Sequence, residues 1–202
     1  MKTGWIVLGV VFLIAFLLGS SYIGRRNQMV TKRETVASDF AQVDVVLQRR
    51  ADLIPNLVST VKGYAAQEVT VFADVDKARA AYMGATTPAD KIAANGQIDS
   101  SLVRILALQE NYPQLKSNAN FQSLQDELSG TENRIAIERR RYDDAVQDYN
   151  TYISTFPNSL VASIGGFPRN NAYFTTSPGA QDVPKVDFGT APAMPAPAPA
   201  TP

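Results

Sequence analysis

The chain has 202 residues, 19 basic and 19 acidic side chains, and neither cysteine nor histidine. Its zero formal net charge argues against a nucleic-acid partner, because no overall basic field would attract phosphates. The missing cysteine and histidine exclude disulfides, thiolate nucleophiles, imidazole bases and metal sites that need nitrogen or sulfur ligands. The sequence also contains no phosphate-binding loop, GxSxG elbow or nucleotide-binding fingerprint, so we expect no catalytic residue, cofactor or metal site.

Composition divides the chain into four parts. Residues 1–23 are apolar, residues 24–156 are rich in helix formers, and residues 157–202 contain nine of the twelve prolines. Within the last part, residues 157–175 carry apolar side chains that could dock on a bundle end or on a neighbour. Residues 176–202 are rich in proline and alanine, and the two alternate along 190–202, which predicts a flexible polyproline-like tail.

The first part predicts a membrane anchor. No charge lies between Lys2 and Arg25. Residues 5–23 would extend about 29 Å as a helix, which matches the roughly 30 Å hydrocarbon core of a bilayer. We expect a retained single-pass transmembrane helix, and the alternative is a cleaved signal peptide. The residues expected at the membrane interface are Trp5, Tyr22, Arg25 and Arg26.

The charges that flank this segment predict its orientation. Arg25, Arg26, Lys32 and Arg33 follow it, whereas only Lys2 precedes it. Positive residues favour the cytoplasmic side, so we expect the main domain in the cytoplasm.

The next region predicts a long helix interrupted by a proline. Apolar residues recur at alternating spacings of four and three along residues 30–83, and the phase does not slip at Pro55. This favours one continuous helix that bends at Pro55, where the hydrogen bond to the Ala51 carbonyl is lost. The alternative is two helices, with Asp52 as N-cap and Pro55 in the first turn of the second.

Two further helices are expected. A helix is predicted over residues 88–110, with Thr87 as its N-cap and Pro88 at its first position. Residues 110–118 lack helical phase and predict an extended connection. Large apolar residues repeat every seven positions along residues 121–156, which is typical of a helix in a coiled-coil-like bundle. The chain is therefore predicted to be all-α: a transmembrane helix, an elongated antiparallel bundle of three long helices (four if the first is broken at Pro55), and the proline-rich tail.

Several stretches resemble a known family. They are VDVVLQRRADLIPNLVSTVKGYAAQE, ENYPQLKSNANFQSLQDELSGTENRIAIERRRYDDAVQDYNTYISTFP, and GGF followed by AYF at 165–167 and 172–174. Together they are similar to the LemA family of bacterial membrane proteins, and the resemblance covers most of residues 1–175. It implies a single-pass protein of the bacterial inner or plasma membrane, with a helical bundle and no established catalytic activity. Membrane metalloproteases are the partner class it implies.

The chain departs from that family at two places. Arg26-Asn27 stands where Tyr-Asn is usual, and Gln67 stands where a histidine commonly precedes the glutamate equivalent to Glu68. The second departure puts in doubt any metal or acid–base role for that position.

The densest parts of the resemblance supply candidate structural or interaction residues. They are Arg49, Arg50, Asp52, Pro55, Asn56, Glu68, Gly130, Glu132, Asn133, Arg134 and Glu138. Pro55 is interpreted as an architectural bend, with a recognition notch as the alternative. Gly130 within a helix costs roughly 1 kcal/mol relative to alanine, so we expect close backbone packing there. Glu138 falls on the inward heptad face, and Arg50 is its expected partner.

These features favour a non-enzymatic, membrane-anchored scaffold that forms homo-oligomers or holds partner proteins at the lipid bilayer. The alternative is an adaptor or regulator of a membrane metalloprotease or of another membrane protein. A carboxylate-based hydrolase is the remote alternative.

Overall fold

The computed structural model describes residues 2–174, so the predicted tail at 176–202 lies outside the described residues. Its first element, α1 (Lys2–Lys62), is one helix that contains the whole apolar segment and continues into the bundle. Within the described part of the chain, α1 alone is long and apolar enough to cross a membrane, and its apolar segment is fully exposed. The helix runs through residue 23 without interruption, so the boundary between anchor and bundle stays a prediction.

The helix α1 passes through Pro55 and ends further along the chain. Continuity at Pro55 agrees with the predicted single helix there, and the alternative break with Asp52 as N-cap is wrong. The predicted extent of 30–83 is also wrong, because α1 ends at Lys62 and a turn separates it from α2 (Val69–Gly84). The spacing of apolar residues keeps its phase across the turn because both helices bury their apolar faces in the same core. That core includes Val61, Val75 and Tyr82.

The helix α3 (Pro88–Ala107) begins as predicted. The Thr87 hydroxyl oxygen accepts a hydrogen bond from the Asp90 backbone N–H at 3.2 Å, and Pro88 occupies the first turn. A short 3₁₀ turn, η1 (Leu108–Glu110), follows directly. The connection after it is compact rather than extended, because the one-turn helix α4 (Pro113–Lys116) anchors it by burying Leu115.

The helix α5 (Ala119–Ser154) follows the predicted heptads. The first positions of successive heptads are buried, from Phe121 through Leu128, Ile135 and Tyr142 to Tyr149. The last one, Phe156, lies beyond the end of the helix and is exposed.

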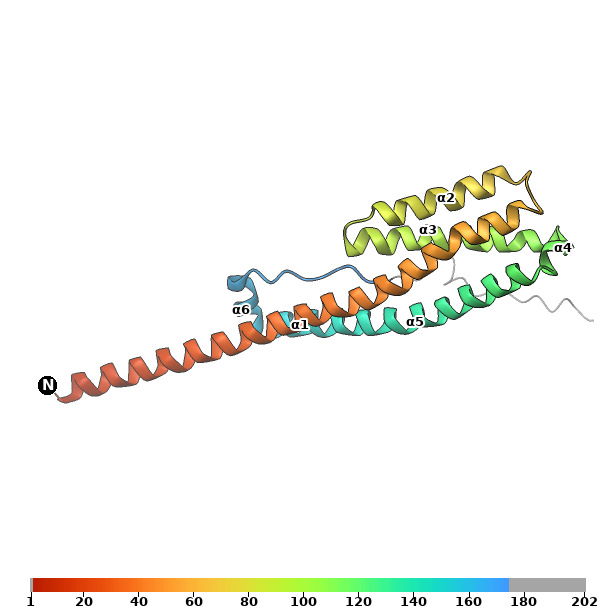
Figure 1. The fold of residues 1–202 in the computed structure, drawn as a ribbon. Helices are drawn as coiled ribbons and strands as arrows, with labels where there is room; N and C mark the ends of the chain where they lie inside the picture. Colours follow the sequence, from red (N-terminus) through yellow and green to blue (C-terminus); the bar gives the residue numbers. More distant parts are fainter. Residues whose placement is uncertain (1, 175–202) are drawn as a thin grey trace, which may run out of the picture.

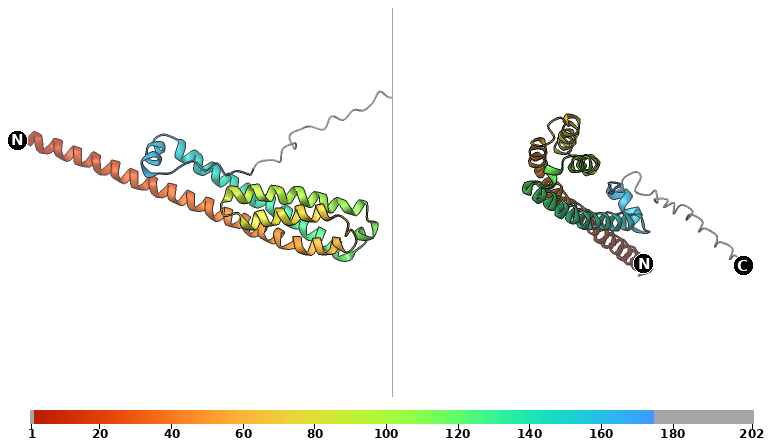
Figure 2. Two further views of the ribbon diagram at one scale, coloured as in Figure 1. Left: turned by 90° about the horizontal axis from the view of Figure 1, so that it is seen from above. Right: turned by 90° about the vertical axis from the view of Figure 1, so that its right-hand side faces the viewer.

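The helices form two pairs. α5 returns along α1, and α2 packs against α3, as Figure 1 shows. The N-terminal half of α1 projects beyond the bundle in Figure 1 and in the left view of Figure 2. The predicted class, an all-α chain with one long apolar N-terminal helix and an elongated helical bundle, is confirmed. The bundle has more helices than predicted because the first predicted rod folds back after Lys62.

The last described residues, 158–174, pack on the bundle. After α5, the short helix α6 (Asn158–Gly165) lies against α1 and α5, and residues 166–174 run back along the bundle. Gly166 caps α6 with φ +68°, a left-handed conformation that glycine adopts without steric cost.

Candidate functional site

The two helix pairs meet at the C-terminal part of α1, around Pro55. Pro55 has no N–H, so the Ala51 carbonyl four residues earlier loses its helical partner. Arg79 of α2 supplies the missing donor, with its Nε 3.0 Å from that carbonyl oxygen. The proline therefore creates an acceptor on α1 that a side chain of the other pair binds.

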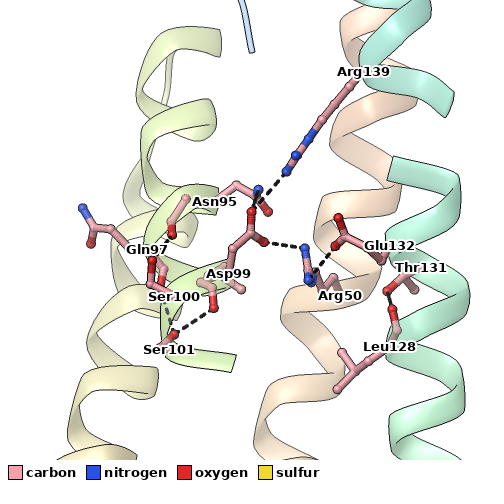
Figure 3. Close-up of polar contacts among 12 residues, drawn as sticks. Arg50, Asn95, Gln97, Asp99, Ser100, Ser101, Leu128, Thr131, Glu132 and Arg139 are labelled. Atoms are coloured by element: carbon pink, nitrogen blue, oxygen red, sulfur yellow. Dashed lines mark hydrogen bonds and ion pairs between the residues drawn. The ribbon is translucent and has the colours of Figure 1, made fainter. Parts of the chain in front are cut away.

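Arg50, one turn before Pro55, is the centre of an ion cluster (Figure 3). Its Nη1 lies 2.5 Å from Asp99 Oδ1 on α3, and its Nη2 lies 2.7 Å from Glu132 Oε2 on α5. The contact with Asp99 is also a hydrogen bond, whereas the contact with Glu132 is an ion pair without hydrogen-bond geometry. One arginine of α1 thus connects α3 to α5.

A second arginine approaches the same carboxylate. Arg139 Nη2 lies 3.4 Å from Asp99 Oδ2, and the Asn95 amide donates to that oxygen at 3.1 Å. We define the Arg50 cluster as Arg50, Asn95, Asp99, Glu132 and Arg139. Its two arginines and two carboxylates balance, which limits the free energy lost when these charges are partly removed from water.

The contacts of the Arg50 cluster show that the predicted partner of Arg50 is wrong, and they give Glu132 a partner. Glu138 is not the partner of Arg50; it pairs with Arg141 at 3.1 Å, one turn along α5. The carboxylate that Arg50 does bind on α5 is Glu132, a predicted site residue with no predicted partner. Asp99 and Arg139 were not predicted as site residues, because their proximity depends on where α2 and α3 fold back.

A neighbouring polar cluster also joins the helix pairs. Asp44 of α1 accepts a hydrogen bond from the Tyr82 hydroxyl of α2 at 2.7 Å. It also forms an ion pair with Lys91 of α3 at 2.5 Å. Burial, followed by the hydrogen bond to Asp44, raises the pKa of Tyr82 far above its usual range. The tyrosine is therefore a neutral donor at physiological pH.

Gly130 lies on an open part of the surface, which corrects the expected close packing. A Cβ built at Gly130 would have no atom within 4 Å. An opening of about 270 Å³ is lined by Gly130 together with Arg49, Glu127 and Arg134. A second opening, of about 530 Å³, shares the last three residues and is also lined by Val45. We define the Gly130 surface as five of these lining residues: Val45, Arg49, Glu127, Gly130 and Arg134.

The other predicted residues lie around these two regions. Arg49 forms an ion pair with Glu127. Asp52 accepts a hydrogen bond from Gln48 at 2.9 Å, whereas Asn56 and Asn133 are exposed.

Glu68 lies at the turn between α1 and α2. It accepts a hydrogen bond at 3.0 Å from the Tyr112 hydroxyl, which in turn accepts one from Gln67 at 2.7 Å. Gln67 thus takes part in a polar link between the α1–α2 turn and the connection before α4. Within residues 2–174, no group of three or more acidic side chains is placed to hold a metal ion.

The predicted membrane-interface residues lie along the projecting part of α1. Trp5 and Arg26 are exposed, Tyr22 packs against the edge of the core, and Arg25 contacts α6.

The segment after α6 covers one side of α5. The Tyr149 hydroxyl donates to the Pro168 carbonyl at 2.9 Å, and the Asn150 amide donates to the Asn170 carbonyl at 2.6 Å. The Phe174 backbone N–H donates to Asp143 Oδ1 at 3.1 Å. Burial nevertheless raises the pKa of Asp143, outweighing that hydrogen bond and the nearby Arg139.

A groove of about 800 Å³ borders the Arg50 cluster between α2, α3 and the end of this segment. Its lining includes Asp74, Lys77 and Arg104 together with Asp99, so charges of both signs face it. The Arg139 guanidinium stacks over the Phe174 ring at 4.9 Å and forms the groove's far edge.

Comparison with known proteins identifies relatives of this chain and its family. The chain is 28% identical over 204 aligned positions to magnetosome protein MamQ 2 of Paramagnetospirillum magneticum, an alignment covering 88% of this chain and 74% of that protein. Magnetosome protein MamQ of Magnetospirillum gryphiswaldense is 27% identical, with 89% and 74% covered. Protein LemA of Metamycoplasma hominis is 22% identical, with 84% and 75% covered. The LemA family model matches residues 39–188, about three quarters of the sequence. The chain belongs to the LemA family.

Proposed function

We propose that this chain is a non-enzymatic, membrane-anchored helical scaffold that associates with a second copy of itself through the Gly130 surface. The apolar segment of α1 fits a membrane location, and the names of the relatives carry no enzyme activity. The observation that carries the proposal is the open position of Gly130 in the middle of α5.

Glycine at this position is unexplained by the chain alone. It weakens a helix by about 0.5–1 kcal/mol relative to alanine. No described atom lies where an alanine methyl group would need space. A small residue does, however, let a second helix approach closely, and this supports an intermolecular role for Gly130.

The surrounding side chains fit a second copy. Val45 is exposed on α1, and Arg134 makes no ion pair within residues 2–174. A two-fold-related copy brings the same surface to itself, so Arg134 of each copy could face Glu127 of the other. Apolar and charged groups of both signs suit such a self-complementary contact.

Three variants test the proposal by light scattering of the full chain in mild detergent. Gly130→Leu should reduce the assembly to a monomer while the melting temperature stays near that of the wild type, because the site is open within one chain. Ala136→Leu, an exposed position on the opposite side of α5, is the matched control and should leave the assembly intact.

Gly130→Ala separates stability from assembly. It should raise the free energy of unfolding of one chain by about 0.5–1 kcal/mol but weaken association, because the added methyl group stands between the two helices. An unchanged assembly in Gly130→Leu would overturn the Gly130 surface as the interface. A wild-type chain that is monomeric but copurifies with a membrane protease would instead favour the adaptor function.

The orientation is a second part of the proposal. The four positive residues after the apolar segment support a cytoplasmic bundle. The chain has no cysteine, so Ser38→Cys introduces a single thiol at an exposed position. In intact cells, an impermeant maleimide should leave this thiol unlabelled, and labelling before lysis would reverse the orientation.

A further inference from the structure

The short helix α6 lies beside the point where α1 leaves the apolar segment. Arg25 Nη1 donates a hydrogen bond to Asn158 Oδ1 at 2.5 Å, which ties the start of α6 to α1. Arg25 is two residues after Ile23, about 3 Å along the helix axis. Figures 1 and 2 both show α6 at the end of the bundle nearest the projecting half of α1.

This end of the molecule has one apolar face without a partner. Asn158, Val161 and Ala162 are buried against the bundle. Phe156, Leu160 and Ile164 have 82%, 58% and 76% of their surface exposed. Leu160 and Ile164 lie four residues apart in α6, so they fall on one side of the helix. Phe156 lies just before α6, in the connection from α5. Large apolar side chains thus gather on the face that α6 turns away from the bundle.

The same region carries no charge. Residues 149–168 contain no acidic or basic side chain, so bringing them to a bilayer would not remove an ion from water. Asp148, just before the stretch, is paired with Lys32, and the other charges around it are cations: Arg25 and Arg26 on α1, and Arg169 after α6. Cations at this level suit the anionic headgroups of a membrane surface.

We propose that α6 is an interfacial helix, whose Leu160 and Ile164 side chains, together with Phe156 just before the helix, insert into the bilayer boundary beside the membrane-spanning part of α1. This inference rests on the anchoring proposed above. Because Arg25, two residues after the predicted span, binds Asn158 at the start of α6, the helix lies at the level where that span ends. Because α1 already holds α6 at the membrane, the effective concentration of the bilayer is high, and a short helix suffices. With α1 crossing the bilayer and α6 lying on it, the bundle has two contacts with the membrane and a defined tilt.

Spin labels on single cysteines test this inference in the full chain. The chain is reconstituted into vesicles of phosphatidylcholine and phosphatidylglycerol, with a label at Leu160→Cys or at Ile164→Cys. Val103→Cys in α3 is the control, since Val103 is 69% exposed and lies in the bundle. Leu13→Cys, within the apolar segment, reports on the anchor. A thermal melt of each labelled chain checks that the bundle is folded.

The readout is the ratio of collision rates with oxygen, which concentrates in lipid, and with a water-soluble nickel chelate. Labels at 160 and 164 should resemble the label at 13, with oxygen collisions dominant. The label at 103 should show the reverse.

Each contrary result has a distinct meaning. Labels at 160 and 164 that resemble the label at 103, while the label at 13 is in lipid, overturn the interfacial helix and leave the anchor intact. A label at 13 that is open to the chelate overturns the anchor and the inference with it. Dipolar broadening between labels at 164 that disappears on dilution with unlabelled chain would assign this face to a second copy and also overturn the inference.

Discussion

Removing the positive charge of Arg50 should destabilise the bundle measurably. The variant Arg50→Met keeps the apolar stem and deletes the guanidinium that connects Asp99 to Glu132. Breaking a fully buried ion pair costs about 3–5 kcal/mol, whereas an exposed pair contributes about 0–1 kcal/mol. The Arg50 side chain is 9% exposed, but those of Asp99 and Glu132 are 30% and 47% exposed and regain water.

We therefore expect a loss of about 2–3 kcal/mol in the free energy of unfolding, between the two limits. For a chain of this size the melting temperature falls by roughly 2–4 °C per kcal/mol, so the expected decrease is about 4–12 °C. Circular dichroism of the full chain in mild detergent measures it.

A double-mutant cycle then separates the ion pair from packing. Arg50→Met, Asp99→Asn and the double variant should give a coupling energy of about 1–2 kcal/mol, since the side chains are in direct contact. Glu138→Gln is the control, because the ion pair that Glu138 makes among residues 2–174 is with Arg141 on its own helix. It should change stability by less than about 0.5 kcal/mol. A silent Arg50→Met, or a larger loss in Glu138→Gln, would refute the assignment of the Arg50 cluster as the joint between the helix pairs.

Three further predictions concern the polar groups around the bundle core. Arg79→Ala should cost about 1–3 kcal/mol by chemical denaturation, because it leaves the Ala51 carbonyl without a donor. In a Pro55→Ala background the same change should cost distinctly less, because residue 55 then supplies its own N–H; equal costs in both backgrounds would contradict this. Tyr82 has a pKa raised above its unfolded value, so its contribution is complete below about pH 10 and is lost as the pH rises through the folded pKa. Tyr82→Phe should therefore lower stability at pH 7 by about 1 kcal/mol and flatten the decline above pH 10 in a pH series of melts, whereas a decline as steep as that of the wild type would count against it. Asp143 has a pKa raised above its ordinary 3.8, so its ionisation opposes folding as the pH rises through the folded pKa. Asp143→Asn should raise the melting temperature at pH 7 and have little effect at pH 3; a decrease at pH 7 would mean that the carboxylate stabilises the bundle.

The helical class, the third predicted helix and its buried stripe could be predicted because they are local patterns. The seven-residue repeat fixes which face of α5 is buried, as Ile135 and Tyr142 confirm. The same holds for the start of α3, where the Thr87 side chain and the proline after it act within one turn.

The turn after Lys62 could not be predicted from apolar spacing alone. A stripe that keeps its phase is equally compatible with one rod and with two antiparallel helices that share a core. The contacts of the site show the difference. Arg79 lies 28 residues after Ala51, about 42 Å away along a continuous helix, yet the two are hydrogen-bonded. The signals for a turn were Gly63, directly after the last helical residue, and the polar residue Glu68 at a position of the apolar stripe.

That missed turn explains why the Arg50 cluster was only partly predicted. Arg50 was expected to need an acidic partner, and it has two. The nearer carboxylate, Asp99, belongs to α3, whose position beside Arg50 follows from the reversal of α2. Glu138 was favoured because it shares the inward heptad face, but its carboxylate reaches Arg141 one turn away.

Chemical crosslinking in living cells tests the proposed scaffold most directly. Val45→Cys places the only thiol of the chain on the Gly130 surface, and Val103→Cys places it at an equally exposed position in α3. A membrane-permeant bifunctional maleimide should join two chains through residue 45, giving a product of twice the 21.9 kDa mass, and should give little product through residue 103. Absence of the dimer at residue 45, or equal yields at both positions, would contradict self-association through this surface.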